Sequence, residues 1–273
     1  METTLNRPAL WTLPALNAAD HKYTRGHAVL LGGGEFTGAA RLAAIAAQRA
    51  GAGLVTVMAP EIAWPIYATS LLSALTRPYT DAAWNESMND DRVTAVLVGP
   101  GAGVNATASH CIATAQATEK PLVLDADALT LLAQEPTLRT TLTHAVLTPH
   151  EGEYAKLARA YDLDVSAEKS ARALALAKAS DAVVVLKGAD TYIASPEGKV
   201  VHHHSATPWL ATAGTGDVLA GLITGLLAQG MPSFEACCAG AWLHTQAAQA
   251  FGHGMVAEDL LAAIPAAFAD SHP

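Results

Sequence analysis

The chain has 273 residues, of which 51% are hydrophobic and only 15% are charged, so it has the material for a sizeable core and lacks the composition of a disordered protein. Its formal net charge of −9 argues against nucleic acid or an anionic membrane surface as a partner, because both are bound through basic patches. The charge does not exclude a small phosphorylated ligand, since a few backbone amides and one lysine can hold a phosphate locally.

Cysteine usage and the absence of long apolar runs indicate the compartment. Cys111, Cys237 and Cys238 do not make a disulfide framework, because adjacent cysteines cannot easily form an unstrained bridge. No apolar run reaches the roughly 18–20 residues that a membrane span needs, and the first ten residues do not resemble a signal peptide. We therefore expect a soluble cytoplasmic protein with no membrane association.

Short aliphatic runs alternate with alanine-rich stretches along most of the chain. Six runs predict strands, at Ala28–Leu31, Leu54–Met58, Ala95–Val98, Leu122–Leu124, Ala145–Leu147 and Val183–Leu186. They are continuously apolar, which is typical of strands buried on both faces of a parallel sheet. The stretches between them predict helices at Ala39–Arg49, Ala106–Ala115, Glu151–Ala160 and Ala167–Ala179. This alternation predicts βαβ units and a three-layer α/β/α sandwich with a mostly parallel central sheet.

The final third of the chain has a different pattern. Asp190–Ser195 and Lys199–His204, joined by the turn residues Pro196–Gly198, predict a β-hairpin. Three helices are predicted after it, at Asp217–Ala228, Phe234–Ala250 and Val256–Ala267. Neither a linker nor an internal repeat divides the chain, so residues 1–273 are expected to form one domain.

Polar or glycine-rich groups follow five of the predicted strands. They are Gly32–Gly34, Gly99–Gly103, Asp125 with Asp127, Thr148–His150, and Lys187 with Gly188. In an open parallel sheet, ligands bind past the carboxyl ends of the strands, so these groups predict a site along one edge of the sheet. The first group fits a dinucleotide fingerprint poorly, because the third glycine of G-x-G-x-x-G comes one position late. A tight turn beside the next helix, or a loop that closes over a substrate, are the alternatives.

The stretch ATAGTGDVLAG places Gly214, Thr215, Gly216 and Asp217 at the start of a predicted helix. The free amides there can hold an anion, and an acid in the first turn also stabilises a helix through its dipole. Three interpretations remain open: a helix cap, an anion cradle, or a catalytic base beside an anion cradle. We expect the dipole to keep Asp217 ionised, so that it can accept a proton from an alcohol while the amides stabilise a phosphoryl group.

Two further groups lie at predicted strand ends. Lys187 is either solvated or a contact to phosphate or nucleotide. His150 and Glu153 lie three residues apart at a helix start, where Glu153 either holds Mg²⁺ through water or takes part in a capping arrangement.

The triplet His202, His203 and His204 has the composition of a metal site. Neighbouring side chains on a strand point to opposite faces, so the three imidazoles cannot converge on one ion. We therefore expect no metal bound by the three histidines together.

Six segments together resemble a known family, the ADP-dependent NAD(P)H-hydrate dehydratases, which repair hydrated nicotinamide cofactors. The segments are LLGGGEFTGAARLAAIAAQRAGAGLVTV, VGPGAG, PLVLDADAL, LTPHEGEYAKL, VVVLKGADTYIA and ATAGTGDVLAGLITGLLAQG. The resemblance begins near Lys22, reaches the last helices and keeps the expected order.

This resemblance implies a ribokinase-like fold, usually assembled as a homotetramer. It also implies that ADP and the S-epimer of hydrated NADH or NADPH (NADHX or NADPHX) give AMP, phosphate and NADH or NADPH. The nucleotide, ADP or ATP with Mg²⁺, would phosphorylate the hydroxyl on the hydrated ring, and phosphate would then leave more readily than hydroxide does. The epimerase domain found in many relatives is absent from the 273 residues, so we expect only one of the two repair activities.

Site residues follow from the resemblance by position in each motif. Ala40, Gly103 and His150 would contact the hydrated cofactor. The adenine nucleotide would be contacted by Lys187, Gly188, Ala189, Asp190, Thr191 and Gly216. Asp217 would be the base on the hydroxyl and would also contact the substrate, with the amides of Gly214, Thr215 and Gly216 as the anion hole. His150 and Glu153 match the spacing of the Asn-x-x-Glu element of related kinases, which helps to place Mg²⁺ and phosphate.

Two departures from the family pattern stand out. Ala213 replaces the first glycine of the usual Gly-Gly-Thr-Gly-Asp, which would cost about 1 kcal/mol if the position needs positive φ. The loop Ser205–Leu210 replaces an Asn-Pro-Gly-Met element. Two alternatives follow: a kinase of the same fold acting on a small vitamin alcohol, such as hydroxyethylthiazole or a pyridoxal-like compound, or a nucleotide-binding protein without turnover.

Overall fold

A computed structural model describes residues 3–140, 142–204 and 207–269 of the chain. These residues form a ten-stranded sheet with the order β1-β10-β9-β8-β7-β6-β5-β2-β3-β4. The strands are β1 (Thr4–Leu5), β2 (His27–Leu31), β3 (Leu54–Ala59), β4 (Leu75–Pro78), β5 (Ala95–Val98), β6 (Leu122–Leu124), β7 (Ala145–Leu147), β8 (Val183–Leu186), β9 (Asp190–Ala194) and β10 (Val200–His204).

The sheet is mostly parallel, as predicted. Every pairing from β4 across to β8 is parallel, and the antiparallel pairings are those of β9 with β8 and with β10. All six predicted strands and the hairpin are present, with ends that differ by at most one residue. The edge strands β1 and β4 were not predicted, because they are short and exposed and lack a continuous apolar run.

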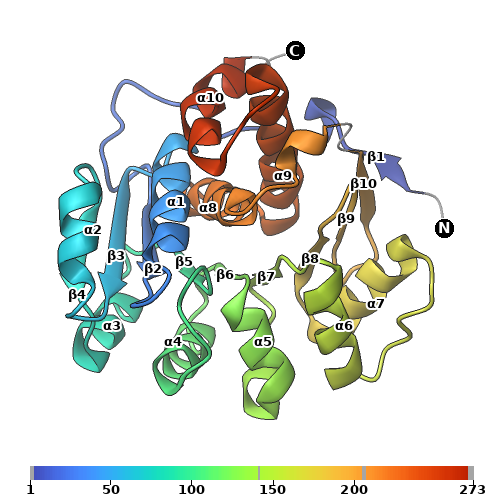
Figure 1. Ribbon diagram of the computed structural model, residues 1–273, viewed down its shortest axis with the longest axis horizontal. Helices are drawn as coiled ribbons and strands as arrows, with labels where there is room; N and C mark the ends of the chain where they lie inside the picture. Colours follow the sequence, from blue (N-terminus) through green and yellow to red (C-terminus); the bar gives the residue numbers. More distant parts are fainter. Residues whose placement is uncertain (1–2, 141, 205–206, 270–273) are drawn as a thin grey trace.

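Helices cover both faces of the sheet (Figure 1). They are α1 (Thr37–Arg49), α2 (Trp64–Ser70), α3 (Asp81–Met88), α4 (Ala106–Gln116), α5 (Asp127–Gln134), α6 (Glu151–Ala160), α7 (Lys169–Ser180), α8 (Thr215–Ala228), α9 (Ser233–Phe251) and α10 (Ala257–Ala269). Alternate residues of β2 enter two separate cores: Ala28 and Leu30 pack with α1 and α8–α10, whereas Val29 and Leu31 pack with α3, α4 and the helices beside them. The predicted three-layer α/β/α architecture is confirmed.

Helix α8 lies in the centre of one helical layer, and its position depends on close contact with α1. A Cβ atom added at Gly221 would lie 2.2 Å from the carbonyl oxygen of Ala43, and one at Gly225 would lie 2.3 Å from that of Ala47. The absence of side chains at these two positions lets the helix backbones approach each other, which fixes where the first turn of α8 meets the sheet. Among the residues described, no helix combines the length and apolar character needed to cross a membrane.

Candidate functional site

An ion pair between two strand ends lies at the centre of the candidate site. Lys187 follows β8 and places its Nζ 2.8 Å from Oδ1 of Asp125, which follows β6. The hydroxyl of Thr148, after the intervening strand β7, donates a hydrogen bond of 2.8 Å to the same oxygen. Burial disfavours the charged lysine, but the carboxylates of Asp125 and Glu153 outweigh it and raise the pKa of Lys187. The lysine is therefore held charged at the edge of the sheet.

The backbone between Asp125 and Asp127 directs these two acids to different places. Ala126 has φ 48° and ψ −115°, a conformation that costs an L-residue on the order of 1–3 kcal/mol. Asp125 faces Lys187, whereas Oδ2 of Asp127 accepts a hydrogen bond of 2.8 Å from the amide of Gly103. The sequence placed both acids at a strand end but did not give either a role.

Asp217 lies in the first turn of α8, directly after a glycine turn. Gly214 caps the helix with φ 88°, a conformation that favours glycine, and the hydroxyl of Thr215 donates to the carbonyl oxygens of Leu210 and Thr212. The first amides of a helix have no partner within the helix, so those of this turn are available to an anion. Among the residues described, positive φ outside glycine occurs at Ala126, Asp162 and Asp181, so Ala213 does not carry the strain considered for it.

The protonation of Asp217 differs from the expectation. Burial raises the pKa of its carboxyl to about 7, and repulsion from Asp125 adds to the effect, while Lys187 opposes it. The carboxylates of Asp127 and Glu153 raise this pKa further. The expectation that the helix dipole keeps Asp217 ionised was therefore wrong, because burial, and after it the acids of other elements, favours the protonated form. A carboxyl that titrates near neutrality has the pKa of an effective general base.

His150 and Glu153 form the capping arrangement that the sequence left as one alternative. Nδ1 of His150 accepts hydrogen bonds from the amides of Gly152 and Glu153, at 3.0 and 3.2 Å. In return, Oε2 of Glu153 accepts one of 2.8 Å from the amide of His150. Burial raises the pKa of Glu153, against the effect of Lys187. Glu153 therefore has a structural role at the start of α6, in addition to any role with a metal.

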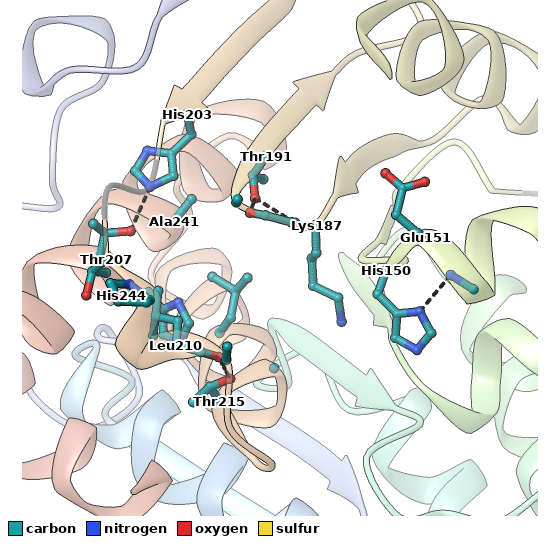
Figure 2. Close-up of a pocket in the computed structure, with 18 residues that line it drawn as sticks. His150, Glu151, Lys187, Thr191, His203, Thr207, Leu210, Thr215, Ala241 and His244 are labelled. Atoms are coloured by element: carbon teal, nitrogen blue, oxygen red, sulfur yellow. Dashed lines mark hydrogen bonds between the residues drawn. The ribbon is translucent and has the colours of Figure 1, made fainter. Parts of the chain in front are cut away.

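A first cavity of about 570 Å³ opens beside Lys187 (Figure 2). Five of the six residues expected to contact nucleotide line it: Lys187, Gly188, Ala189, Thr191 and Gly216. His150 lines it as well. The sequence did not identify the opposite wall, which includes His203, Thr207, Leu210, His244 and Thr245. His244 and Thr245 belong to α9, and no motif marks that helix as part of a site.

A second cavity of about 860 Å³ lies at the ends of β2 and β5. Gly103 and Asp127 line it, together with Phe36, Tyr79 and residues of the two glycine-rich loops. Ala40, which the resemblance places at the substrate, is 1% exposed and packs in the core on α1, so it lines neither cavity.

Asp190 is the expected nucleotide contact that the first cavity does not include. Its carboxylate bonds instead to His202 and His204 on β10. Of the unusual loop Ser205–Leu210, residues 205–206 lie outside the described residues, and Pro208–Leu210 form a 3-10 helix whose first and last residues line the first cavity.

Known proteins resemble this chain in sequence. A family model described as NAD(P)H-hydrate dehydratase matches residues 28–266. An ADP-dependent (S)-NAD(P)H-hydrate dehydratase from Neisseria meningitidis is 37% identical over 91% of this chain and 84% of its own length. A bifunctional NAD(P)H-hydrate repair enzyme from Salinibacter ruber is 38% identical over 97% of this chain, which spans about half (52%) of that longer protein.

Solved structures resemble the whole chain. An ADP/ATP-dependent NAD(P)H-hydrate dehydratase from Bacillus subtilis, co-crystallised with ATP and Mg²⁺, matches with a TM-score of 0.82 and 25% identity over the full length of both chains. A ribokinase-like superfamily protein from Enterococcus faecalis matches with a TM-score of 0.83 and 26% identity, over 95% of this chain and 92% of its own.

Proposed function

This chain belongs to the NAD(P)H-hydrate dehydratase family, and from that premise we propose that it uses ADP to dehydrate the S-epimer of hydrated NADH or NADPH, releasing AMP and phosphate. The observation that carries the proposal is the position of Asp217. It combines a pKa of about 7 with the free amides of the first α8 turn, beside the charged Lys187. A base, an anion cradle and a cation are the groups that phosphoryl transfer to an alcohol requires.

In this proposal each of the two cavities binds one substrate. The nucleotide occupies the first cavity, where Lys187 and the amide of Gly216 approach its phosphates. The hydrated nicotinamide ring occupies the second, where Phe36 and Tyr79 offer aromatic surfaces and Gly103 and Asp127 offer polar groups. Asp217 follows Gly216 of the first cavity directly, and its carboxyl is repelled by Asp127 of the second.

The proposed reaction proceeds in two steps. Asp217 takes the proton of the ring hydroxyl, and the hydroxyl oxygen bonds to the terminal phosphorus of ADP as the bond from that phosphorus to the AMP oxygen breaks. The amides of Gly214–Gly216 stabilise the charge on the phosphoryl oxygens during transfer. The carbon–oxygen bond then breaks, phosphate leaves, and loss of a proton from the neighbouring ring carbon restores the dihydropyridine.

We propose that Mg²⁺ accompanies the nucleotide. The carboxylates of Asp125, Asp127 and Glu153 each act on Asp217, and Lys187 pairs with Asp125. Carboxylate oxygens beside phosphate oxygens are the ligands that Mg²⁺ prefers, so the donor set fits the ion. When bound, the ion would neutralise charge on the phosphates. Glu153 would hold it through water, with the oxygen Oε1 that accepts no amide in the α6 cap and lies 3.5 Å from Nε2 of His150.

The alternatives have weaker support. A hydroxyethylthiazole kinase from Pyrococcus horikoshii matches with a TM-score of 0.63 and 16% identity, which is a likeness of fold alone. The main reason to suspect a protein without turnover was Ala213, and that residue is not strained.

We also propose that the protein assembles as a homotetramer. Ile62 and Leu72, both exposed near the edge strand β4, would be covered in such an assembly.

A direct assay tests the proposed function. Purified protein is mixed with hydrated NADH, Mg²⁺ and either ADP or ATP, and absorbance at 340 nm is followed while AMP or ADP release is measured. We expect NADH to reappear in a nucleotide-dependent manner, with one AMP formed per NADH when ADP is supplied. Phosphorylation of small vitamin alcohols without any action on hydrated NADH would instead favour the kinase.

A further inference from the structure

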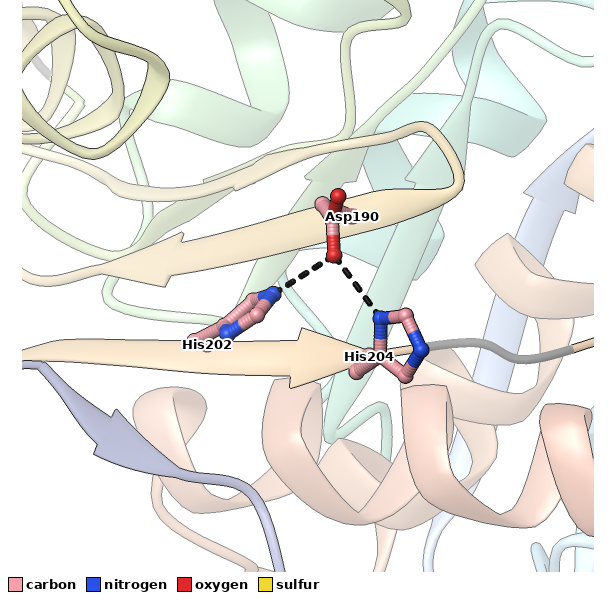
Figure 3. A group of neighbouring side chains, drawn as sticks. All are labelled: Asp190, His202 and His204. Atoms are coloured by element: carbon pink, nitrogen blue, oxygen red, sulfur yellow. Dashed lines mark hydrogen bonds and ion pairs between the residues drawn. The ribbon is translucent and has the colours of Figure 1, made fainter.

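Two histidines and an aspartate meet on one face of the β9–β10 hairpin (Figure 3). Asp190 begins β9 and lies directly opposite His204 in the antiparallel register, and His202 lies two residues earlier on the same strand. Oδ1 of Asp190 is 2.8 Å from Nε2 of His202 and 2.9 Å from Nδ1 of His204. Side chains that alternate along a strand return to the same face every second residue, so His202 and His204 both reach the one carboxylate.

The middle histidine points to the other face. Nε2 of His203 lies 2.8 Å from the hydroxyl of Thr245 on α9, and Nδ1 lies 3.1 Å from the side-chain amide of Asn6. Burial lowers the pKa of His203 to about 4, so this imidazole is neutral and belongs to the interior. The three consecutive imidazoles therefore do not converge. The outer two are joined instead by Asp190, an acid on the neighbouring strand that the sequence pattern of the histidines did not reveal.

The geometry of the three groups suits a small, tetrahedral ion. One donor atom from each residue lies within 4.8 Å of the other two. Ligands at about 2.0–2.2 Å around a tetrahedral Zn²⁺ are separated by about 3.3 Å, so movements of a few tenths of an ångström to about an ångström would bring the donors to their places. The ring of His202 is already held by stacking on Tyr192, with centroids 4.8 Å apart and planes at 11°.

The site is also accessible to solvent, and in the described part of the chain no lysine or arginine pairs with its carboxylate. The side chains of His202, Asp190 and His204 are 26%, 51% and 59% exposed. Among the described residues, the ion-pair partners of Asp190 are these two imidazoles. An ion can therefore enter from solvent and replace the protons that the imidazoles share with the carboxylate.

We propose that Asp190, His202 and His204 form a binding site for a divalent transition-metal ion such as Zn²⁺, separate from the Mg²⁺ proposed for the nucleotide. Two imidazole nitrogens and one carboxylate favour Zn²⁺, Ni²⁺ or Cu²⁺ over Mg²⁺, which prefers oxygen ligands alone. A fourth position remains for water or an anion. The ion would link the two strands of a hairpin whose opposite face, through Thr191 and His203, lines the first cavity.

Zinc titration of metal-free protein tests this proposal. The protein carries no histidine tag, is stripped with a chelator, and is titrated with ZnCl₂ by calorimetry. We expect one equivalent to bind, and expect His204→Ala and Asp190→Asn each to weaken that binding at least about tenfold. The matched control is His144→Gln, which changes an exposed histidine before β7 and should leave the binding unchanged.

Two results would overturn the proposal. One is an unmodified protein that takes up no stoichiometric Zn²⁺. The other is equal binding by all variants, which would place the ion elsewhere. Circular dichroism of each variant verifies folding, and both changed side chains are more than half exposed. The absorption spectrum of bound Co²⁺ gives a second readout, since tetrahedral coordination produces intense visible bands that the His204→Ala protein should lose.

Discussion

Lys187 and Asp125 form an ion pair across strand β7. Lys187 follows β8, Asp125 follows β6, and β7 lies between these two strands in the sheet. The hydroxyl of Thr148 at the end of β7 fills the space and bonds to the same carboxylate oxygen. Three consecutive strands of the sheet thus contribute one residue each to a small network. Asp217, in the first turn of α8, is repelled by Asp125 and attracted by Lys187 of this network.

Replacing Asp217 by asparagine should abolish turnover while sparing nucleotide binding. Asparagine keeps the size of the side chain but cannot accept the proton, and loss of a general base costs typically about 10²–10⁴-fold in rate. Hydrated-NADH turnover and calorimetric ADP binding are compared in the variant. Asp91→Asn, at an exposed turn, is the matched control and should behave as the unmodified protein. An Asp217→Asn protein with full activity would show that another group is the base.

The rate of the reaction should depend on pH through Asp217. Its pKa is raised to about 7, mainly by burial, and only the deprotonated form accepts a proton. We expect kcat/KM to fall tenfold per pH unit below about pH 7 and to level off above it. The profile is measured with ADP held saturating. A flat profile from pH 5.5 to 8.5 would contradict the assignment of the base.

The same raised pKa predicts a cost in stability. Asp217 holds its proton more tightly in the folded protein than in the unfolded chain, whose aspartates titrate near 3.8. The tighter binding of this proton favours the folded state, and that contribution to the free energy of unfolding is fully present below about pH 4 and is lost as the pH rises through about 7. Asp217→Asn removes this loss and should stabilise the protein by on the order of 4 kcal/mol at pH 8 and by little at pH 4. Urea unfolding at the two pH values measures the difference, and an equal effect at both would contradict it.

Removing the Lys187 charge should destabilise the protein and weaken nucleotide binding together. Lys187→Met leaves Asp125 buried without its cation, which costs about 3–5 kcal/mol for pairs of this kind. Adding Asp125→Leu should restore much of the stability but none of the ADP affinity. Lys178→Met, on the exposed face of α7, is the control. Thermal unfolding and calorimetry report the two effects separately, and an ADP affinity unchanged by Lys187→Met would remove this residue from the nucleotide site.

Gly221→Ala should disturb the packing of α8 on α1. The new Cβ would meet the carbonyl oxygen of Ala43 at 2.2 Å, and backbone cannot move aside as a flexible side chain can. We expect a loss of about 1–3 kcal/mol, measured by urea unfolding. Gly38→Ala, in the first turn of α1 with no atom within 4 Å of the added Cβ, should be neutral or slightly stabilising. If both substitutions have the same effect, helix propensity and not the close approach determines the outcome.

Much of the fold follows from the sequence, because buried parallel strands leave short, continuous apolar runs such as Val183–Leu186 between stretches with helical character. The helices α2, α3 and α5 were missed, since each has at most eight residues. Within the candidate site, each residue at a strand end could be located. The raised pKa of Asp217 could not be predicted, because it depends mainly on burial in the folded chain and then on acids that are distant in sequence.

The cap of α6 has a consequence for the chemistry of His150. Its Nδ1 accepts two amide hydrogen bonds, so in the neutral ring the hydrogen must sit on Nε2. The start of a helix therefore selects one tautomer of this imidazole. A ring fixed in this form presents a hydrogen-bond donor, and not an acceptor, at Nε2, which lies 3.5 Å from Oε1 of Glu153. An anionic oxygen of a ligand in the first cavity can accept a hydrogen bond from this imidazole, whereas an N–H or O–H group of the ligand cannot donate one to it.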